Sequence, residues 1–176
     1  KMNNVPAAPQ SVAWPGKSTV AEILETGGSK LPIGTYSVQS DHLPNEYPAI
    51  KDKRAGIQDM GSQLVAEIFF GTSDSKSQSW LDLCAGPGGK AALLNNLLTE
   101  NFPNAKFLAN EPSEHRAELV ARVVPKSKII SFDGRNSSEF GETFDRILID
   151  APCSGLGALR RRPEARWRRS INDLKE

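Results

Sequence analysis

The sequence predicts an α/β fold built on a parallel sheet, and three observations support this prediction. From Gln58 onward, short apolar segments alternate with segments of helical periodicity. An acidic residue stands at or directly after the end of each short apolar segment. A glycine-rich turn, AGPGG, joins the first of these segments to a helix. Alternation at this spacing is typical of parallel strands that are joined by helical crossovers.

The first part of the chain has a different composition and predicts a separate, smaller unit. Residues 1–54 are rich in Pro, Gly, Ser and Asn. They predict short strands and turns around one helix from Ser18 to about Glu25, which Ser18 or Thr19 caps and Gly27-Gly28 ends. We therefore expect residues 1–54 to form a small α+β segment and residues 55–176 to form the first part of a larger α/β domain.

Within residues 55–176 the elements follow in a regular order. The stretch QDMGSQLVAEIFFG predicts a helix with an apolar face formed by Leu64, Val65, Ile68 and Phe69, and Gly71 ends it. A second helix follows AGPGG, and a third begins after Ser113, which is placed as its N-cap. The predicted strands are Trp80–Cys84, Lys106–Asn110, Lys128–Phe132 and Phe144–Asp150.

The composition excludes several classes of protein. The chain has 176 residues, is 38% hydrophobic and contains no apolar run near the roughly 20 residues that span a bilayer. Its N-terminus lacks the apolar stretch of a signal peptide. Cys84 and Cys153 form no CxxC pair, and with two distant histidines they indicate neither a zinc site nor a disulfide framework. We expect a cytoplasmic protein without metal or membrane partner.

Four acidic residues mark the ends of the predicted strands. They are Asp82, Glu111, Asp133 and Asp150. Ligands of open parallel sheets bind beyond the carboxyl ends of the strands, so these side chains are expected in one crevice. Glu111 suits ribose hydroxyls and Asp133 suits an adenine amino group. The alternative is that these acids only cap turns and helices.

The glycine-rich turn predicts a nucleotide cofactor and leaves its identity open. A phosphate-binding P-loop would need glycine at Cys84 and Ser or Thr at Ala91, so that interpretation fails. The pattern GxGxxG/A fits Gly86, Gly88 and Ala91, and Glu111 follows at a suitable distance for a ribose. This pattern does not separate a nicotinamide cofactor from S-adenosylmethionine.

A cluster of arginines near the end of the sequence indicates a polyanionic partner. Its members are Arg160, Arg161, Arg162, Arg166, Arg168 and Arg169. The planar guanidinium fork of arginine matches phosphate, and a nucleic-acid backbone presents a row of phosphates. The alternative is a solvated charged surface.

Longer motifs resemble one known family. The stretches DLCAGPGGKA and DAPCSGLGALRRRPEARW resemble the two signatures DLCAAPGGKT and DAPCSGxGxxRRxPDxRW of the S-adenosylmethionine-dependent RNA cytosine-5 methyltransferases, the Fmu/Sun (NOL1/NOP2/Sun) family. GIQDMGSQLVA and FDGR also resemble segments of this family. The chain departs from the usual pattern at Gly86, Ala91 and Glu164, where Ala, Thr and Asp are usual.

The resemblance implies a fold, a reaction and a substrate. The fold is an incomplete Rossmann-like class I methyltransferase sheet, preceded by part of a small RRM-like or ferredoxin-like domain that binds RNA. The reaction is methyl transfer from S-adenosyl-L-methionine to carbon 5 of cytosine in RNA, with ribosomal RNA as the expected substrate.

The resemblance also implies the site residues. Cys153, Asp150 and Lys90 are the implied catalytic residues, and the arginine cluster is implied to contact RNA phosphates. The implied cofactor-binding residues are Asp82, Cys84, Ala85, Gly86, Pro87, Gly88, Gly89, Lys90, Glu111, Arg116, Asp133, Gly134 and Asp150.

One family feature is missing from the sequence. In this family the attacking cysteine belongs to a later TCS motif, and the cysteine of DAPCS assists product release. No TCS occurs in the 176 residues. We therefore expect a partial chain that is inactive or nearly inactive by itself. The strand order of the fold also predicts that the first and fourth strands are neighbours, with Cys84 and Cys153 near one another.

Two alternative functions remain at this point. The GxGxxA loop also fits an NAD-dependent oxidoreductase. The arginine cluster and the N-terminal segment also fit a non-catalytic RNA-binding module. Binding of S-adenosylhomocysteine rather than NAD would favour the methyltransferase over both.

Overall fold

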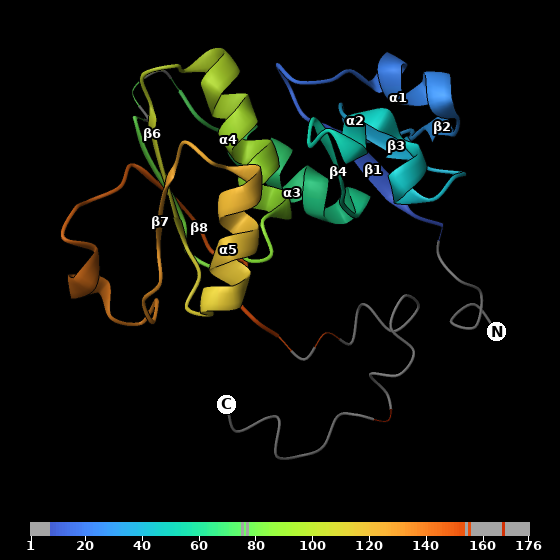
Figure 1. Ribbon diagram of the computed structural model, residues 1–176. Helices are drawn as coiled ribbons and strands as arrows, with labels where there is room; N and C mark the ends of the chain where they lie inside the picture. Colours follow the sequence, from blue (N-terminus) through green and yellow to red (C-terminus); the bar gives the residue numbers. More distant parts are fainter. Residues whose placement is uncertain (1–7, 75, 77, 154, 156–166, 168–176) are drawn as a thin grey trace. The chain divides into compact units, whose positions relative to one another are not determined.

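The computed structural model describes residues 8–74, 76, 78–153, 155 and 167 (Figure 1). The chain divides into two compact units, of which one is Pro9–Asp150 and the other combines Lys1–Ala8 with Ala151–Glu176. The unit Pro9–Asp150 contains a small antiparallel sheet and a parallel sheet, each with four strands. No helix among the described residues is long and apolar enough to cross a membrane.

The N-terminal part of the unit forms the antiparallel sheet. Its elements are β1 (Gln10–Ala13), α1 (Val20–Thr26), β2 (Ser29–Lys30), β3 (Ser37–Gln39), the short 3-10 helix Pro44–Glu46, α2 (Pro48–Lys51) and β4 (Ala55–Ile57). The strand order is β2-β3-β1-β4, and every neighbouring pair is antiparallel. The succession βαββαβ is that of ferredoxin-like domains, so the small α+β fold predicted for this part is confirmed.

The helix α1 covers one face of this sheet, and its local sequence explains its bounds. The side chain of Thr19 accepts a hydrogen bond from the Glu22 N–H over 3.1 Å, as an N-cap does. Gly27 ends the helix with a φ of 144°, a value that L-residues other than glycine rarely adopt. The core beneath the helix consists of Ala13, Ile23, Val38, Tyr47, Ala49 and Ala55.

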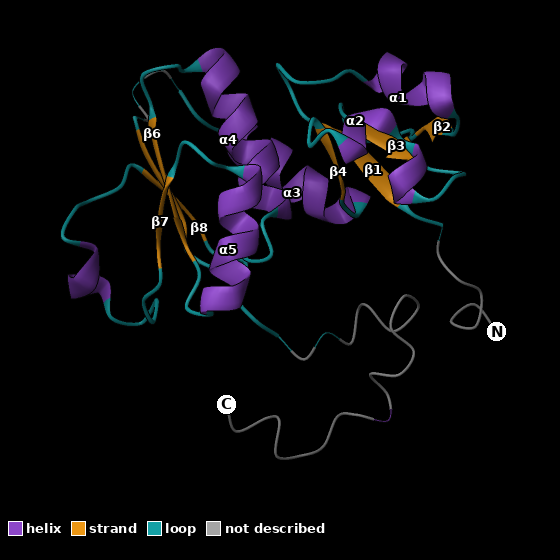
Figure 2. Cartoon of the chain, in the orientation of Figure 1, coloured by secondary structure: helices purple, strands orange, loops and turns teal. Residues whose placement is uncertain are grey.

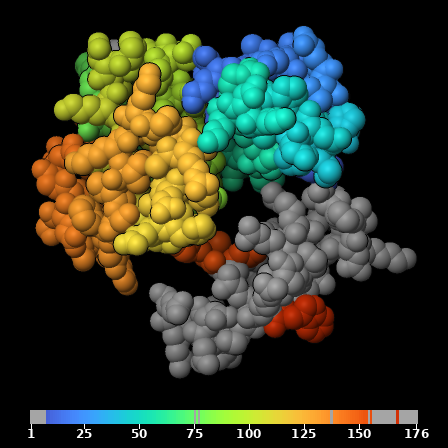
Figure 3. Space-filling view, viewed as in Figure 1, coloured from blue at the N-terminus to red at the C-terminus, as the bar shows by residue number. Residues whose placement is uncertain are grey.

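The opposite face of the antiparallel sheet packs against two helices of the parallel-sheet part. Val12 and Trp14 share a core with Ala66, Ala92, Leu93 and Leu97. The fully buried Gln63 ties the two parts together, because its amide donates to the Ser11 carbonyl over 3.2 Å and accepts from the Ser37 hydroxyl over 2.6 Å. The two parts form a continuous surface in Figure 3. Both faces of the small sheet are therefore covered.

The second half of the unit forms the predicted parallel sheet. Its elements are α3 (Met60–Gly71), β5 (Ser79–Asp82), α4 (Gly89–Asn101), β6 (Lys106–Asn110), α5 (Glu114–Val123), β7 (Lys128–Ile130), the 3-10 helix Ser137–Phe140 and β8 (Arg146–Leu148). The strand order is β7-β6-β5-β8, and all three pairs are parallel. The prediction that the first and fourth strands of this sheet are neighbours is confirmed.

The three long helices α3, α4 and α5 pack with one side of the sheet (Figure 2). Their shared core contains Trp80 and Phe107 from neighbouring strands, Leu94 and Leu98 from α4 and Val120 from α5. Burial of this apolar surface is the main stabilising contribution to the α/β part. In β8, Leu148 belongs to this core, whereas the preceding residue, Ile147, is 47% exposed.

Two details of the sequence prediction are wrong. The strands predicted to reach Cys84, Phe132 and Asp150 end at Asp82, Ile130 and Leu148. After Ile130, the Phe132 N–H bonds to the Asn110 side chain over 3.0 Å, so a side chain replaces the strand partner. In addition, Ile68 on the predicted apolar face of α3 is 63% exposed, whereas Gln63 and Ala66 are fully buried.

Candidate active site

A tightly folded glycine loop joins β5 to α4 and lies at the carboxyl ends of the parallel strands. The Ala85 N–H donates to the Asn110 carbonyl over 2.9 Å, which anchors the loop to the end of β6. The Gly88 N–H donates back to the Ala85 carbonyl over 2.8 Å, and the Gly86–Pro87 peptide bond is cis. Gly88 has a φ of 114°, and a Cβ there would lie 2.7 Å from the Val123 side chain, so only glycine fits.

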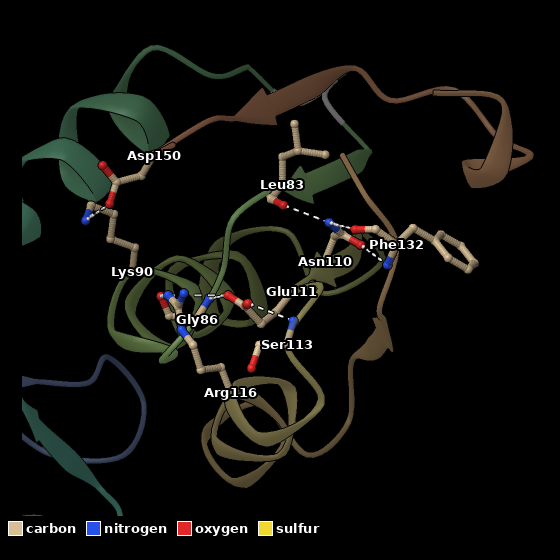
Figure 4. Close-up of polar contacts among 9 residues, drawn as sticks. All are labelled: Leu83, Gly86, Lys90, Asn110, Glu111, Ser113, Arg116, Phe132 and Asp150. Carbon is tan, nitrogen blue, oxygen red and sulfur yellow. Dashed lines mark hydrogen bonds and ion pairs between the residues drawn. The ribbon is translucent and has the colours of Figure 1, made fainter. Parts of the chain in front are cut away.

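Glu111 lies directly after β6 and is held against this loop (Figure 4). Glu111 is only 2% exposed, and its carboxylate accepts hydrogen bonds from the Gly86 N–H and the Ser113 N–H, each over 3.1 Å. The guanidinium of Arg116 lies 3.4 Å from the same carboxylate and also donates to the Gly86 carbonyl. A Cβ at position 86 would lie 2.2 Å from the Glu111 carboxylate, so the contact depends on glycine.

Asn110 is a residue of this edge that the sequence prediction missed. Its side chain is fully buried and donates to the Leu83 carbonyl over 2.9 Å and to the Phe132 carbonyl over 3.1 Å (Figure 4). It also accepts the Phe132 N–H. Asn110 therefore connects the segments that follow β5 and β7. Its position as the last residue of a buried strand was the available signal in the sequence.

Lys90 and Asp150, the two catalytic candidates of this unit, lie together. The Lys90 ammonium donates to an Asp150 carboxylate oxygen over 2.5 Å and to the Ser62 hydroxyl over 3.2 Å. The Lys90 side chain is 15% exposed and the Asp150 side chain 55% exposed. Lys90 thus has two hydrogen-bond partners, while more than half of the Asp150 side chain is exposed to solvent.

Asp82 ends β5 and is almost fully buried. It is 1% exposed, and neither carboxylate oxygen has a hydrogen-bond partner of good geometry among the described residues. Burial raises the pKa of Asp82 to about 7; the nearby Cys84 N–H and the Lys90 ammonium act in the opposite direction. Asp82 is therefore partly protonated near neutral pH.

The two cysteines differ in their surroundings. Cys84 is partly buried beside the acidic edge, and burial, followed by the charge of Asp82, raises the pKa of its thiol. Such a thiol is a poor nucleophile at neutral pH. Cys153 belongs to the other compact unit, is exposed, and its sulfur accepts a hydrogen bond from the Gly155 N–H over 3.4 Å.

The remaining predicted positions lie on loops of the same edge or outside the described residues. Asp133 follows β7 and is bound by Arg135 over 2.6 Å, which lowers the pKa of its carboxyl to about 2. Gly134 lies next to Leu83: a Cβ at position 134 would be 3.1 Å from the Leu83 side chain. The arginine cluster, Arg160 to Arg169, lies outside the described residues.

A cavity of about 680 Å³ lies at the opposite, amino edge of the sheet. It is lined in part by Lys106 and Lys128, the first residues of β6 and β7. None of the acidic residues at the carboxyl edge lines it. In the described part of the chain, no group of three or more His, Cys, Asp and Glu residues is arranged to hold a metal ion.

Comparison with known protein families decides between the methyltransferase and the oxidoreductase. The family model described as 16S rRNA methyltransferase RsmB/F matches residues 72–176. The chain belongs to this family. The matched region contains both the glycine loop and the DAPCS signature. Membership in the RsmB/F family therefore favours a methyltransferase.

Relatives from bacteria extend the similarity to the N-terminal part. The Mycobacterium tuberculosis protein named "Putative methyltransferase MT1451" is 45% identical over 170 residues, covering 92% of this chain and 36% of the relative. The ribosomal RNA small subunit methyltransferase B of Shewanella oneidensis is 35% identical over 135 residues, or 73% of this chain and 30% of the relative. The chain thus spans about a third of the length of these relatives.

Solved structures agree on the fold. The crystal structure of PH0851 has a TM-score of 0.83 at 20% identity and covers 99% of this chain and 42% of its own chain. The structure of NSun6 from Pyrococcus horikoshii with SFG has a TM-score of 0.61 at 23% identity, covering 78% and 36%. The Rossmann-like sheet and the preceding α+β part therefore recur together in PH0851.

Proposed function

We propose that this chain provides the S-adenosyl-L-methionine site and part of the active site of an RNA cytosine-5 methyltransferase that acts on ribosomal RNA. One observation carries the proposal. Glu111 presents a nearly buried carboxylate beside a glycine loop, at the carboxyl edge of a parallel sheet, in a chain of the RsmB/F family. This is the arrangement that adenosine-containing cofactors use in such sheets.

The residues present fit the cofactor. Glu111 supplies an acceptor for the ribose hydroxyls after exchanging its contacts to the Gly86 and Ser113 amides. The missing side chain of Gly86 lets the loop pack directly against the Glu111 carboxylate, so the loop backbone and the proposed ribose acceptor lie at one place. Asp133 is the proposed acceptor for the adenine amino group. When bound, the cofactor supplies an electrophilic methyl group.

We propose that the target cytosine contacts Asp150 and Cys153. Carbon 5 of cytosine becomes nucleophilic when a thiolate adds to carbon 6, and loss of the carbon 5 proton and of the thiolate then restores the ring. Asp150, whose carboxylate accepts a hydrogen bond from Lys90, is proposed to contact the ring nitrogens while charge moves through the base. Since the sequence contains no TCS motif, we assign Cys153 to product release and expect the 176 residues by themselves to turn over slowly, if at all.

The proposed substrate, ribosomal RNA, is taken from the names of the relatives and of the family model. The relative in Shewanella oneidensis is named as acting on ribosomal RNA, and the family model refers to 16S rRNA. The arginine cluster is proposed to contact the RNA backbone. Two free cysteines fit a reducing compartment, and we include a cytoplasmic location in the proposal.

Nucleoside analysis tests the proposal. The whole protein that carries this chain is incubated with methyl-labelled S-adenosylmethionine and unmodified small-subunit ribosomal RNA, and the labelled nucleoside is identified. We expect 5-methylcytidine, and we expect Asp150→Asn to lower its formation at least 100-fold. Asp52→Asn, which changes a carboxylate in the N-terminal part, is the control and keeps full activity. Label in another nucleoside or in no nucleoside contradicts the proposal.

A further inference from the structure

Gln58 combines deep burial with an unpaired side chain. It lies between β4 and α3, is 6% exposed, and makes two backbone hydrogen bonds: its N–H donates to the Gln10 carbonyl over 2.9 Å, and its carbonyl accepts from Gln63 over 2.7 Å. Its side-chain oxygen and nitrogen are both buried without a hydrogen-bond partner among the described residues. Leaving a buried amide without hydrogen-bond partners is unfavourable, so this arrangement needs an explanation.

The side chain of Gln58 lies against the first residue of α4. Its amide carbon is 3.5 Å and its amide nitrogen 3.8 Å from the place where a Cβ of Gly89 would stand. The φ of Gly89 is outside the left-handed region, and these distances are ordinary contacts, so the protein itself does not require glycine here. The place of a Gly89 Cβ is therefore free of protein atoms, and it adjoins the Gln58 amide at the glycine loop.

The first turn of α4 favours a negatively charged group at this place. The helix has 13 residues, its N-cap Gly88 provides no side-chain cap, and its first turn contains no acidic residue. The first N–H groups of a helix lack partners within the helix and carry partial positive charge. Lys90 adds a full positive charge in the same turn. Carboxylates bind at such helix starts.

We propose that Gln58 binds the amino-acid end of the S-adenosylmethionine cofactor, with its amide N–H donating to the carboxylate at the first turn of α4. The inference rests on the proposed function and names a cofactor-binding residue outside the glycine loop. A side-chain amide has both a donor and an acceptor. It therefore complements a group that carries a carboxylate and an ammonium side by side.

Two ligands that differ at this end provide the test. S-adenosylhomocysteine contains the amino-acid end, whereas 5′-methylthioadenosine lacks it and keeps the adenosine. Gln58→Met removes the amide at similar volume. We expect this variant to bind S-adenosylhomocysteine about tenfold more weakly in calorimetric titration and to bind 5′-methylthioadenosine within twofold of the unsubstituted chain. Gln39→Ala, which removes an amide that bonds to the Pro9 carbonyl, is the matched control and changes neither affinity.

Unfolding of the ligand-free variants separates binding from a structural role. Because Gln58→Met replaces an unpaired buried amide by an apolar group, we expect an unchanged or higher unfolding temperature. An equal loss of affinity for both ligands, or an unchanged affinity for both, overturns the proposed role of Gln58 but not the proposed function. Failure of the unsubstituted chain to bind S-adenosylhomocysteine overturns the proposed function and this inference with it. Gln58→Glu is a second variant, in which a carboxylate opposes that of the ligand and lowers the affinity further.

Discussion

The ammonium nitrogen of Lys90 lies 2.5 Å from a carboxylate oxygen of Asp150. The two residues are 60 positions apart in sequence and belong to the two signatures that the chain shares with its family. The contact joins the first turn of α4 to the segment that follows β8. It brings the glycine loop and the start of the DAPCS segment to one place.

The Lys90–Asp150 pair predicts a small coupling in stability, because more than half of the Asp150 side chain is exposed to water. In a double-mutant cycle with Lys90→Met and Asp150→Asn, we expect a coupling free energy of roughly 0.3–1 kcal/mol by urea unfolding. A coupling above about 2 kcal/mol would show that the pair is a structural element rather than an accessible catalytic pair.

Gly86 predicts a steric conflict that is specific to this chain. A Cβ at position 86 would lie 2.2 Å from the Glu111 carboxylate and 2.9 Å from the Arg116 guanidinium. Gly86→Ala should therefore displace Glu111 and lower the free energy of unfolding by about 1–3 kcal/mol. The matched change Gly71→Ala, where no atom lies within 4 Å, should leave stability unchanged or raise it by up to about 1 kcal/mol. Equal effects of both changes would contradict the observed Glu111 contact.

Asp82 predicts a characteristic dependence of stability on pH. Burial raises the pKa of its folded-state carboxyl to about 7, so the folded chain holds this proton more tightly than the unfolded chain. The contribution to stability is complete below about pH 4 and is lost as the pH rises through 7. Relative to Asp82→Asn, the unsubstituted chain should lose about 2–3 kcal/mol between pH 5 and pH 8.

Chemical denaturation of both proteins at several pH values measures this difference. The variant keeps all other titrating groups, so their contributions cancel in the comparison. A constant difference across this pH range would mean that Asp82 titrates equally in the folded and unfolded chain, and would contradict its burial.

Arg146 predicts a loss of stability when its guanidinium is removed. It donates to the Phe69 carbonyl over 2.8 Å and to the Thr72 carbonyl over 3.1 Å, and it lies 4.9 Å from the centre of the Phe69 ring. Arg146→Lys keeps the charge but loses the planar fork, so we expect a loss of about 1–3 kcal/mol in thermal or urea unfolding. The exposed control Arg122→Lys should change stability by less than about 0.5 kcal/mol. Equal effects at both positions would contradict a stabilising role for the hydrogen bonds from Arg146 to the Phe69 and Thr72 carbonyls.

The parallel sheet and its acidic edge were predictable because they depend on local patterns. The apolar segments predict strands that alternate with helices, and the acidic residues Asp82 and Glu111 are visible at the ends of two of these segments. The exposed Ile68 on α3 was not predictable in this way. The buried side of that helix is set by its packing against the small antiparallel sheet, which the periodicity of one helix does not contain.

The polar residues that the sequence prediction missed depend on contacts between distant segments. Asn110 bonds to Leu83 and Phe132, which lie 27 and 22 positions away. Gln58, in the segment after β4, approaches Gly89, the first residue of α4, only through the tertiary fold. Neither amide has a local pattern that distinguishes it from a surface residue, whereas the glycine loop has one.

Calorimetric titration of the 176-residue chain with S-adenosylhomocysteine and, separately, with NAD tests the central claim most directly. Both ligands contain adenosine, but only the first has the amino-acid end that Gln58 and the first turn of α4 are proposed to bind. We predict one site for S-adenosylhomocysteine, at least 100-fold tighter than any binding of NAD, and at least tenfold weaker in Glu111→Ala because the ribose acceptor is lost. Equal binding of the two ligands, tighter binding of NAD, or an unaffected Glu111→Ala variant would contradict the account.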